Sequence, residues 1–233
     1  MNYTTRFPGI EMLQGFTVIS ENLPYILGGI WVTLTVVVGA LIMGLSLGLV
    51  LSVAQVYGNR VVRRTVGVYV WFFRGIPLLV LLFLFYFGIL ANLQIELSPF
   101  IVSIIVLGLI SSAYQSQIIR GAILSLPEGQ LKAARSIGMS DAKAIIFVIL
   151  PQAIRLSIPA WTNEYTIILK DSAVTYALGV TEILARSRHV AERTYQHFWI
   201  YILAGFIFLL LTYIGTKLFH ILEEKVRTPG YTQ

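Results

Sequence analysis

Four long stretches of this sequence contain no Asp, Glu, Lys or Arg, and they limit the possible folds more than any other feature. They cover residues 22–59, 75–95, 97–119 and 194–216. Each is long enough for the roughly 20 apolar residues that a membrane-spanning helix needs. Only 12% of the residues are charged, whereas a soluble globular domain has about 25%. The pattern predicts an all-α, polytopic membrane protein.

A further span is expected at residues 156–184, although Glu164, Lys170 and Asp171 lower its hydropathy. The chain has to cross the membrane there if the flanking loops are to keep their sides. We therefore predict a single transmembrane domain with about five spans. Their approximate ranges are 24–57, 66–90, 98–124, 156–184 and 197–222.

Basic residues predict the orientation of the spans. They follow spans one, three and five, at Arg60, Arg63, Arg64, Arg120, Lys132, Arg135, Lys143, Arg155, Lys217, Lys225 and Arg227. Because basic loops stay in the cytoplasm, we expect an external amino terminus and a cytoplasmic carboxyl terminus. The last outer loop, with Arg186, Arg188 and Arg193, departs from this rule. It is either a docking surface for an acidic partner or a solvated basic loop.

Residues 125–155 form a polar, amphipathic island between apolar segments. Pro127 suits the first turn of a helix, and Gly138 supplies a left-handed stop. Ser140 can cap a second helix, which we expect to run to Pro151. The small side chains of Ala133 and Ala134 leave one side of the first helix slim enough to enter a groove on another protein. The alternative is an interfacial helix that lies on lipid.

The island resembles the EAA loop of ATP-binding-cassette (ABC) importer permeases, which reads EAA, then Gly, then a hydrophobic residue with Leu-Pro. In this chain the corresponding residues are 132–134, Gly138 and 149–151, and Lys132 replaces the first acid. In that family the segment is the coupling helix that docks on the ATPase subunit. The resemblance implies that the ATPase contacts are Lys132, Ala133, Ala134, Arg135, Gly138 and Met139.

A second resemblance points to a class of solute. Residues 71–79, WFFRGIPLL, look like the FFRGTPLL element of the polar amino-acid permeases in this importer family. Residues 111–122 are similar to the AYxAEIxRGxI element of the same permeases. With the EAA loop, the match covers about residues 69–179. It implies that the solute is a polar amino acid.

Physical arguments give these elements roles at a solute site. Gly75 and Pro77 interrupt a span, and the backbone amides freed there suit a carboxylate. Glu164 would attract an ammonium group, because a carboxylate at membrane depth is costly unless it is paired. The alternative is a structural ion pair between Glu164 and a residue such as Arg74. The predicted solute site comprises Gly75, Ile76, Pro77, Leu78, Ser111, Ser112, Tyr114 and Glu164.

The sequence contains no signature of catalysis. It has no GxxxxGK[ST] phosphate loop and no nucleophile elbow, and its three histidines lack metal-ligand spacing. We therefore expect a non-catalytic chain without cofactor or metal. The net charge of +6 follows from the topology and does not indicate nucleic acid. Gly44 and Gly48 form a GxxxG pattern, which we interpret as close helix packing rather than dimerisation.

These observations predict a permease subunit of an ATP-driven importer for polar amino acids in the cytoplasmic (inner) membrane. The expected partners are an ATPase dimer, a second identical or homologous permease subunit, an extracytoplasmic binding protein, the amino acid and membrane lipid. The alternatives are the non-substrate-binding half of a heterodimer and an importer for another small polar solute. Scattered histidines argue against a membrane enzyme, and Glu164 with the broken span argues against a passive anchor.

Overall fold

The computed structural model describes residues 8–226, with side chains from Gly15 onwards, and this part of the chain contains helices but no strand. The α-helices are α1 (Pro8–Tyr57), α2 (Arg60–Gly75), α3 (Leu78–Phe83), α4 (Pro99–Ser125), α5 (Gly129–Ser136), α6 (Asp141–Ala144), α7 (Leu150–Ser172), α8 (Ile183–Thr194) and α9 (His197–Val226). Two π-helices, η1 (Leu84–Leu90) and η2 (Ile145–Ile149), and the 3₁₀-helix η3 (Ala173–Leu178) join some of them. The predicted all-α class is confirmed.

Four helices of the described chain are long and apolar enough to cross a membrane. They are Gly15–Tyr57, Pro99–Ser125, Asp141–Leu178 and His197–Val226, and the bent pair of α2 with α3 and η1 makes a fifth if it counts as one span. This agrees with the predicted number of about five. The first helix is longer than its predicted span, because α1 already begins at Pro8.

The bent pair turns by 106° between Gly75 and Leu78. The turn has a local cause, because a residue that precedes proline is pushed out of the helical region. Ile76 accordingly has extended dihedral angles, φ −100° and ψ 134°. Beyond the bend, Leu81 and Leu82 are fully buried in a cluster with Phe73. The predicted interruption of this apolar segment is therefore confirmed.

Helix α1 packs closely along α4, and glycines make this approach possible. A Cβ atom added to Gly44 would lie 2.7 Å from the Ser111 hydroxyl oxygen and 2.7 Å from the Gln115 amide nitrogen. One added to Gly48 would lie 3.1 Å from the Cβ of Gln115. The GxxxG pattern thus serves close helix packing inside the chain, as we expected.

The helix that was expected to stop at Pro151 continues past it. Helices α6, η2, α7 and η3 follow one another without a break from Asp141 to Leu178. Proline normally breaks a helix because it lacks an N–H group and its ring clashes with the carbonyl one turn earlier. Here the π-helical turn of η2 directly precedes Pro151 and changes the local hydrogen-bond pattern. The second helix of the island is therefore the start of one long helix that continues to Leu178.

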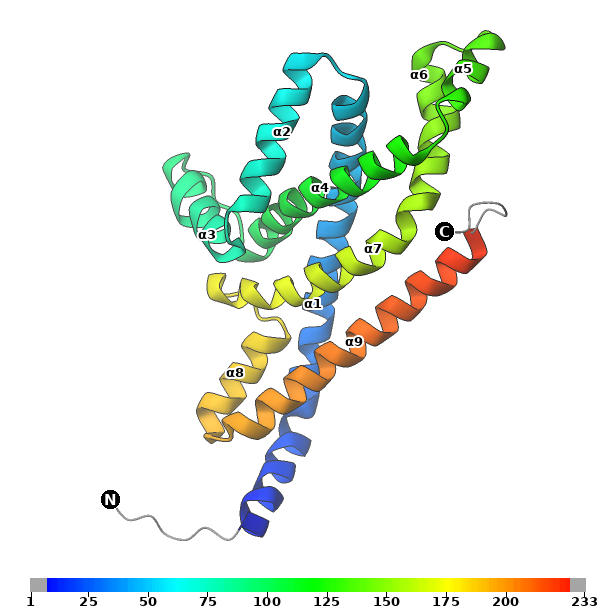
Figure 1. Cartoon of the computed structure of the whole chain (residues 1–233). Coiled ribbons are helices and arrows are strands. Elements are labelled where there is room, and N and C mark those ends of the chain that lie inside the picture. The colour runs from blue at the N-terminus through cyan, green and yellow to red at the C-terminus, as the bar shows by residue number, and fades with distance from the viewer. Residues whose placement is uncertain (1–7, 227–233) are drawn as a thin grey trace.

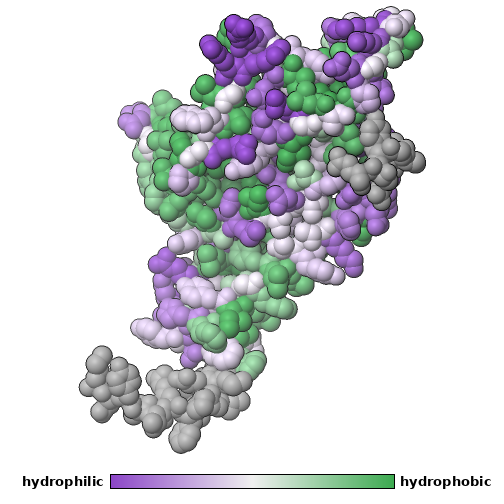
Figure 2. Space-filling model, in the orientation of Figure 1, coloured by the Kyte–Doolittle hydropathy of each residue, from purple (hydrophilic) through white to green (hydrophobic). Residues whose placement is uncertain are grey.

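The basic segments lie toward one end of the molecule. In Figure 1 the α1–α2 connection, helices α5 and α6, and the carboxyl end of α9 point toward the top, whereas α8 and the start of α1 lie at the bottom. Figure 2 shows hydrophilic side chains gathered on the two upper prominences, over the α1–α2 connection and over α5 and α6. Arg227 lies outside the described residues. This arrangement agrees with the grouping from which we predicted the orientation.

The basic outer loop is in fact a helix, α8, whose arginines bind within the chain. The guanidinium of Arg186 donates a 2.9 Å hydrogen bond to the backbone carbonyl of Tyr25 in α1. That of Arg193 donates a 2.6 Å bond to the side-chain oxygen of Asn22, and Arg188 pairs with the glutamate one turn later. The first two contacts hold α8 on α1, whereas the third lies within α8, so this segment is a packed helix and not a loop. A docking role for its exposed residues stays a prediction.

A buried acid caps the start of α8. Both carboxylate oxygens of Glu182 accept backbone hydrogen bonds, at 2.7 Å from Leu184 and 2.6 Å from Ala185. The side chain is fully buried. Burial raises the pKa of Glu182 to about 7, and the two backbone hydrogen bonds act against this rise. The cap satisfies the first amides of α8, which would otherwise be costly to bury.

Candidate functional site

A chain of buried polar side chains connects three helices around Glu164. The hydroxyl of Ser111 on α4 donates a 2.6 Å hydrogen bond to the carboxylate of Glu164 on α7. The side-chain amide of Gln115 donates to the Ser111 oxygen at 2.9 Å and to the backbone carbonyl of Leu41 in α1 at 3.1 Å. Only 2% of Glu164 is exposed. The carboxylate is therefore closed off from solvent in this conformation and bonded within the chain.

Local sequence explains part of this network. Ser111 and Gln115 are four residues apart on α4, so their side chains lie on one face of the helix. Gly44 in α1 leaves room for both. Sequence reasoning did not identify Gln115 as a site residue. The available signal was an amide side chain inside a predicted span, where polar groups need partners because water is absent.

Two of the predicted site residues face elsewhere. The Ser112 hydroxyl lies 2.6 Å from the hydroxyl of Tyr69 on α2. The Tyr114 ring lies under the guanidinium of Arg74, 4.7 Å from its centre. Among the described residues no ion pair joins Arg74 to Glu164. The structural ion pair with Arg74 is therefore not formed in this conformation, and the aromatic face of Tyr114 contacts the cation instead.

The bend between α2 and α3 lies close to α7. Ile76 and Leu78 pack against the buried cluster around Phe73. Leu78 also packs against a second cluster that contains Tyr165, the residue next to Glu164. A Cβ atom at Gly75 would meet nothing within 4 Å, so the backbone is open there. The structure thus brings part of the bend toward the helix that carries Glu164.

The predicted turn between the two helices of the island is present at the other end of the molecule. Gly138 has a φ of +85°, a conformation that glycine adopts at little cost. Its N–H donates to the Arg135 carbonyl at 2.9 Å, and that of Met139 donates to Ala134 at 3.1 Å. The guanidinium of Arg135 also makes two hydrogen bonds to Asp141, of 2.7 and 2.9 Å, which connect α5 with α6.

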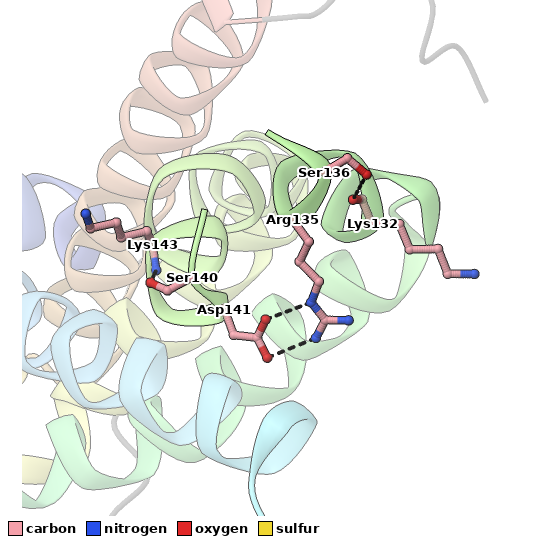
Figure 3. A network of polar contacts seen from close by, with 6 residues as sticks. All are labelled: Lys132, Arg135, Ser136, Ser140, Asp141 and Lys143. Atoms are coloured by element: carbon pink, nitrogen blue, oxygen red, sulfur yellow. Dashed lines mark hydrogen bonds and ion pairs between the residues drawn. The ribbon is translucent and has the colours of Figure 1, made fainter. Parts of the chain in front are cut away.

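Burial corrects our view of the docking face. Ala134 is only 4% exposed and packs inside the chain, so the alanine pair does not form one free slim side. Lys132, Ala133 and Arg135 are exposed, and Figure 3 shows Lys132 extending away from the loop. Ile137 beside the turn is 79% exposed. Sequence reasoning did not single out Ile137, although an apolar side chain next to a left-handed glycine was a usable signal of an exposed apolar residue.

Comparison with known proteins decides the family. Residues 40–228 match the model of the family described as "Binding-protein-dependent transport system inner membrane component". The chain belongs to this family. It is thus the permease component of an ABC importer, and a separate subunit hydrolyses ATP. A permease of this family works with an ATPase and with a solute-binding protein, which agrees with the predicted non-catalytic role.

Individual relatives cover most of the permease. The L-cystine transport system permease protein TcyB of Bacillus subtilis is 34% identical over 87% of this chain and 87% of the relative. The arginine transport system permease protein ArtQ of the same organism is 33% identical over 91% and 97%. The histidine/lysine/arginine/ornithine transport system permease protein HisM of Salmonella typhimurium is 33% identical over 84% and 88%.

Solved structures show the same fold. A crystal structure of an amino acid ABC transporter with histidines superposes with a TM-score of 0.80 at 31% identity, covering 90% of this permease and 98% of that chain. An inward-facing structure of the methionine ABC transporter MetNI gives a TM-score of 0.77 at 20% identity, over 88% and 97%. Because the methionine transporter is only 20% identical, this second comparison supports the fold alone.

The tight α1–α4 contact predicts the effect of a single methyl group. Gly44→Ala would place a Cβ atom 2.8 Å from the Cβ of Ser111, which is fixed to the backbone. We expect α1 and α4 to separate, with a cost of about 1 to 3 kcal/mol, as for other overpacked cores. Thermal unfolding of the detergent-purified permease measures this cost. Gly205→Ala is the control, because a Cβ atom there meets nothing within 4 Å; equal unfolding temperatures for both variants would contradict the contact.

Proposed function

We propose that this permease imports a polar amino acid. Two sets of observations support the solute class. The three relatives above are named for cystine, for arginine, and for histidine, lysine, arginine and ornithine. Within this chain, the sole acid buried in a span among the described residues is Glu164. A carboxylate at that depth suits a solute with an ammonium group, and this observation carries the proposal.

In the proposed site, Glu164 receives the ammonium group and the bend at Gly75, Ile76, Pro77 and Leu78 receives the carboxylate. Ser111 would exchange its bond to Glu164 for a shared bond with the solute. Because Glu164 is 2% exposed here, binding requires α4 and α7 to move apart. Such a movement is what alternating access between two conformations provides. Ser112 and Tyr114 face α2 in this conformation, so they enter the site only if α4 also rotates.

The exposed residues of the coupling loop suit the docking of an ATPase subunit in the proposed importer. Two permease subunits, identical or homologous, would enclose the solute path, and two ATPases would dock on their loops. Lys132, Ala133 and Arg135 offer polar and small contacts, and Ile137 offers an exposed apolar one. The rigid turn at Gly138 would transmit ATP-driven closure of the ATPases to α4 and to the long helix that begins with α6.

A second candidate function is favoured by the closed network. Glu164 already has a hydrogen-bond donor in Ser111, so it needs no ligand to be stable. The chain could then be the non-substrate-binding half of a heterodimer, with Glu164 as a link between helices. The two functions differ in whether the solute affinity depends on Glu164.

Uptake into vesicles tests the proposed function. The complete importer, reconstituted with its ATPase and binding protein, should accumulate a polar amino acid only when ATP is present. A panel of arginine, histidine, lysine, glutamine, glutamate and cystine would identify the solute. ATP-dependent uptake of none of these, by a complex that hydrolyses ATP in response to its binding protein, would contradict the amino-acid proposal.

We further propose that the loop at Gly138 faces the cytoplasm and the α3–α4 connection faces outward. The chain contains no cysteine, so single cysteines can report on each side. A membrane-impermeant thiol reagent added to intact cells should label Gln94→Cys but not Ser140→Cys or Lys225→Cys. All three should react once the membrane is permeabilised. Labelling of Ser140→Cys in intact cells would reverse the orientation.

A further inference from the structure

The start of α2 carries a basic face that neither the solute path nor the coupling loop uses. An open hollow of about 720 Å³ is lined by Arg60, Arg63, Arg64, Gly67, Val68 and Trp71. These residues recur at intervals of three and four, so they lie along one side of the helix. The hollow is thus a continuous surface of α2 with arginines at one end and apolar groups at the other.

The positive charge of this face is not neutralised within the described chain. Arg60, Arg63 and Arg64 are exposed, and none of them takes part in an ion pair among the described residues. The Nε of Arg63 donates one hydrogen bond, to the backbone carbonyl of Gly58 at 2.9 Å, which leaves its two terminal nitrogens available. Clustered guanidinium groups of this kind suit a phosphate, which each of them can bind in a bidentate manner.

The other end of the face is apolar and open. Val68 is 64% exposed and Trp71 is 75% exposed. From Arg60 to Trp71 the helix rises by about 16 Å, close to the depth of one hydrocarbon leaflet of about 15 Å. The arginine end lies at the α1–α2 connection, where Figure 2 shows hydrophilic side chains gathered. Charge and apolar surface are therefore spaced like the head and tails of a phospholipid.

We propose that this face of α2 is a binding site for an anionic phospholipid of the cytoplasmic leaflet. Its phosphate would lie among Arg60, Arg63 and Arg64, and its acyl chains would lie along Val68 and Trp71. The open backbone at Gly67, where an added Cβ would meet nothing within 4 Å, leaves room between the two ends. The same face of a second copy of this chain is a poor occupant, because it would bring the same three positive charges. A free phosphate would leave the apolar end uncovered.

Lipid retention tests the site. The full permease, purified with its ATPase from nanodiscs of equal parts phosphatidylglycerol and phosphatidylcholine, should retain phosphatidylglycerol preferentially. An arginine near an anionic membrane surface contributes a preference of roughly fivefold. The triple variant Arg60→Gln/Arg63→Gln/Arg64→Gln should therefore retain at least about fivefold less of the anionic lipid. Trp71→Ala should lower retention of the same lipid without any change of charge.

A matched control distinguishes binding of the lipid at this site from a general attraction of anionic lipid to basic residues. Arg155→Gln/Lys217→Gln/Lys225→Gln removes three exposed charges from other helices and should retain the lipid as the unmodified chain does. The double variant Arg60→Gln/Arg64→Gln keeps the Arg63 bond near the start of α2, in case the triple variant does not fold. Three results would overturn the proposal. The control variant could lose as much phosphatidylglycerol as the triple variant, or inorganic phosphate alone could displace the lipid completely. The triple variant could also release the ATPase and still retain the lipid as the unmodified chain does.

Discussion

Replacement of Gly138 by valine should abolish transport while the chain still reaches the membrane. The residue has a φ of +85°, which a β-branched side chain strongly resists. The resulting strain of roughly 1 to 3 kcal/mol would depopulate the native turn by about fivefold to more than a hundredfold. Because α5 and α6 meet at this turn, the docking face would lose its shape. ATP-dependent uptake by reconstituted vesicles should fall about tenfold or more.

Two controls show whether the backbone conformation is the cause. Asparagine tolerates positive φ better than other non-glycine residues, so Gly138→Asn should keep most of the uptake. Gly129→Val changes the same loop at a residue whose φ is not positive and whose surroundings are open. It should also transport. Full uptake by the Gly138→Val complex, with the ATPase still co-purifying, would exclude Gly138 as a coupling turn.

Replacement of Glu164 by glutamine should weaken solute affinity and leave the protein folded. Glutamine keeps an oxygen that can accept the hydrogen bond from Ser111, but it carries no charge. A charged hydrogen bond to the ammonium group contributes about 1.5 to 3 kcal/mol. The half-saturation concentration for uptake should rise roughly ten- to more than a hundredfold. Half-saturation and thermal stability are measured together on the same reconstituted complex.

A comparison with Ser111→Ala distinguishes solute binding by Glu164 from a purely structural role of Glu164. Removal of the hydroxyl leaves the carboxylate without the donor seen at 2.6 Å, so this variant should mainly lose stability. If Glu164→Gln behaves in the same way, with lower stability and unchanged half-saturation, Glu164 is a link between α4 and α7 and the chain is the non-substrate-binding half. If neither quantity changes, both roles for Glu164 are wrong.

Local features of the chain were predictable because their causes lie within a few residues. Charge-free stretches identified the spans, since a spanning helix needs a continuous apolar segment. The positive φ of Gly138 and the break before Pro77 follow from the restrictions that glycine and proline place on their own backbone. The resemblance of residues 132–151 to the EAA loop could also be recognised from sequence, because the EAA pattern is short and local.

Contacts between distant segments depended on the tertiary structure. Ser111 is separated from Glu164 by 53 positions, and Gln115 is separated from Leu41 by 74. Hydropathy places such residues in spans but does not fix how each helix is rotated about its axis. Packing fixes it, through the glycine-lined approach of α1 to α4. Tertiary packing likewise buries Ala134 on α5 and leaves Ile137 exposed.

The sequence by itself determined that this protein is an all-α membrane protein, because apolar length acts locally, and its resemblance to the EAA loop indicated the permease family. Only the tertiary structure decided that Glu164 is bonded to Ser111 instead of Arg74, that Arg186 and Arg193 of α8 bind α1, and that the helix continues past Pro151. The first two depend on which partner lies within about 3 Å of a polar group. Helix packing makes that choice, because a buried polar group has to take the partner that the neighbouring helix presents.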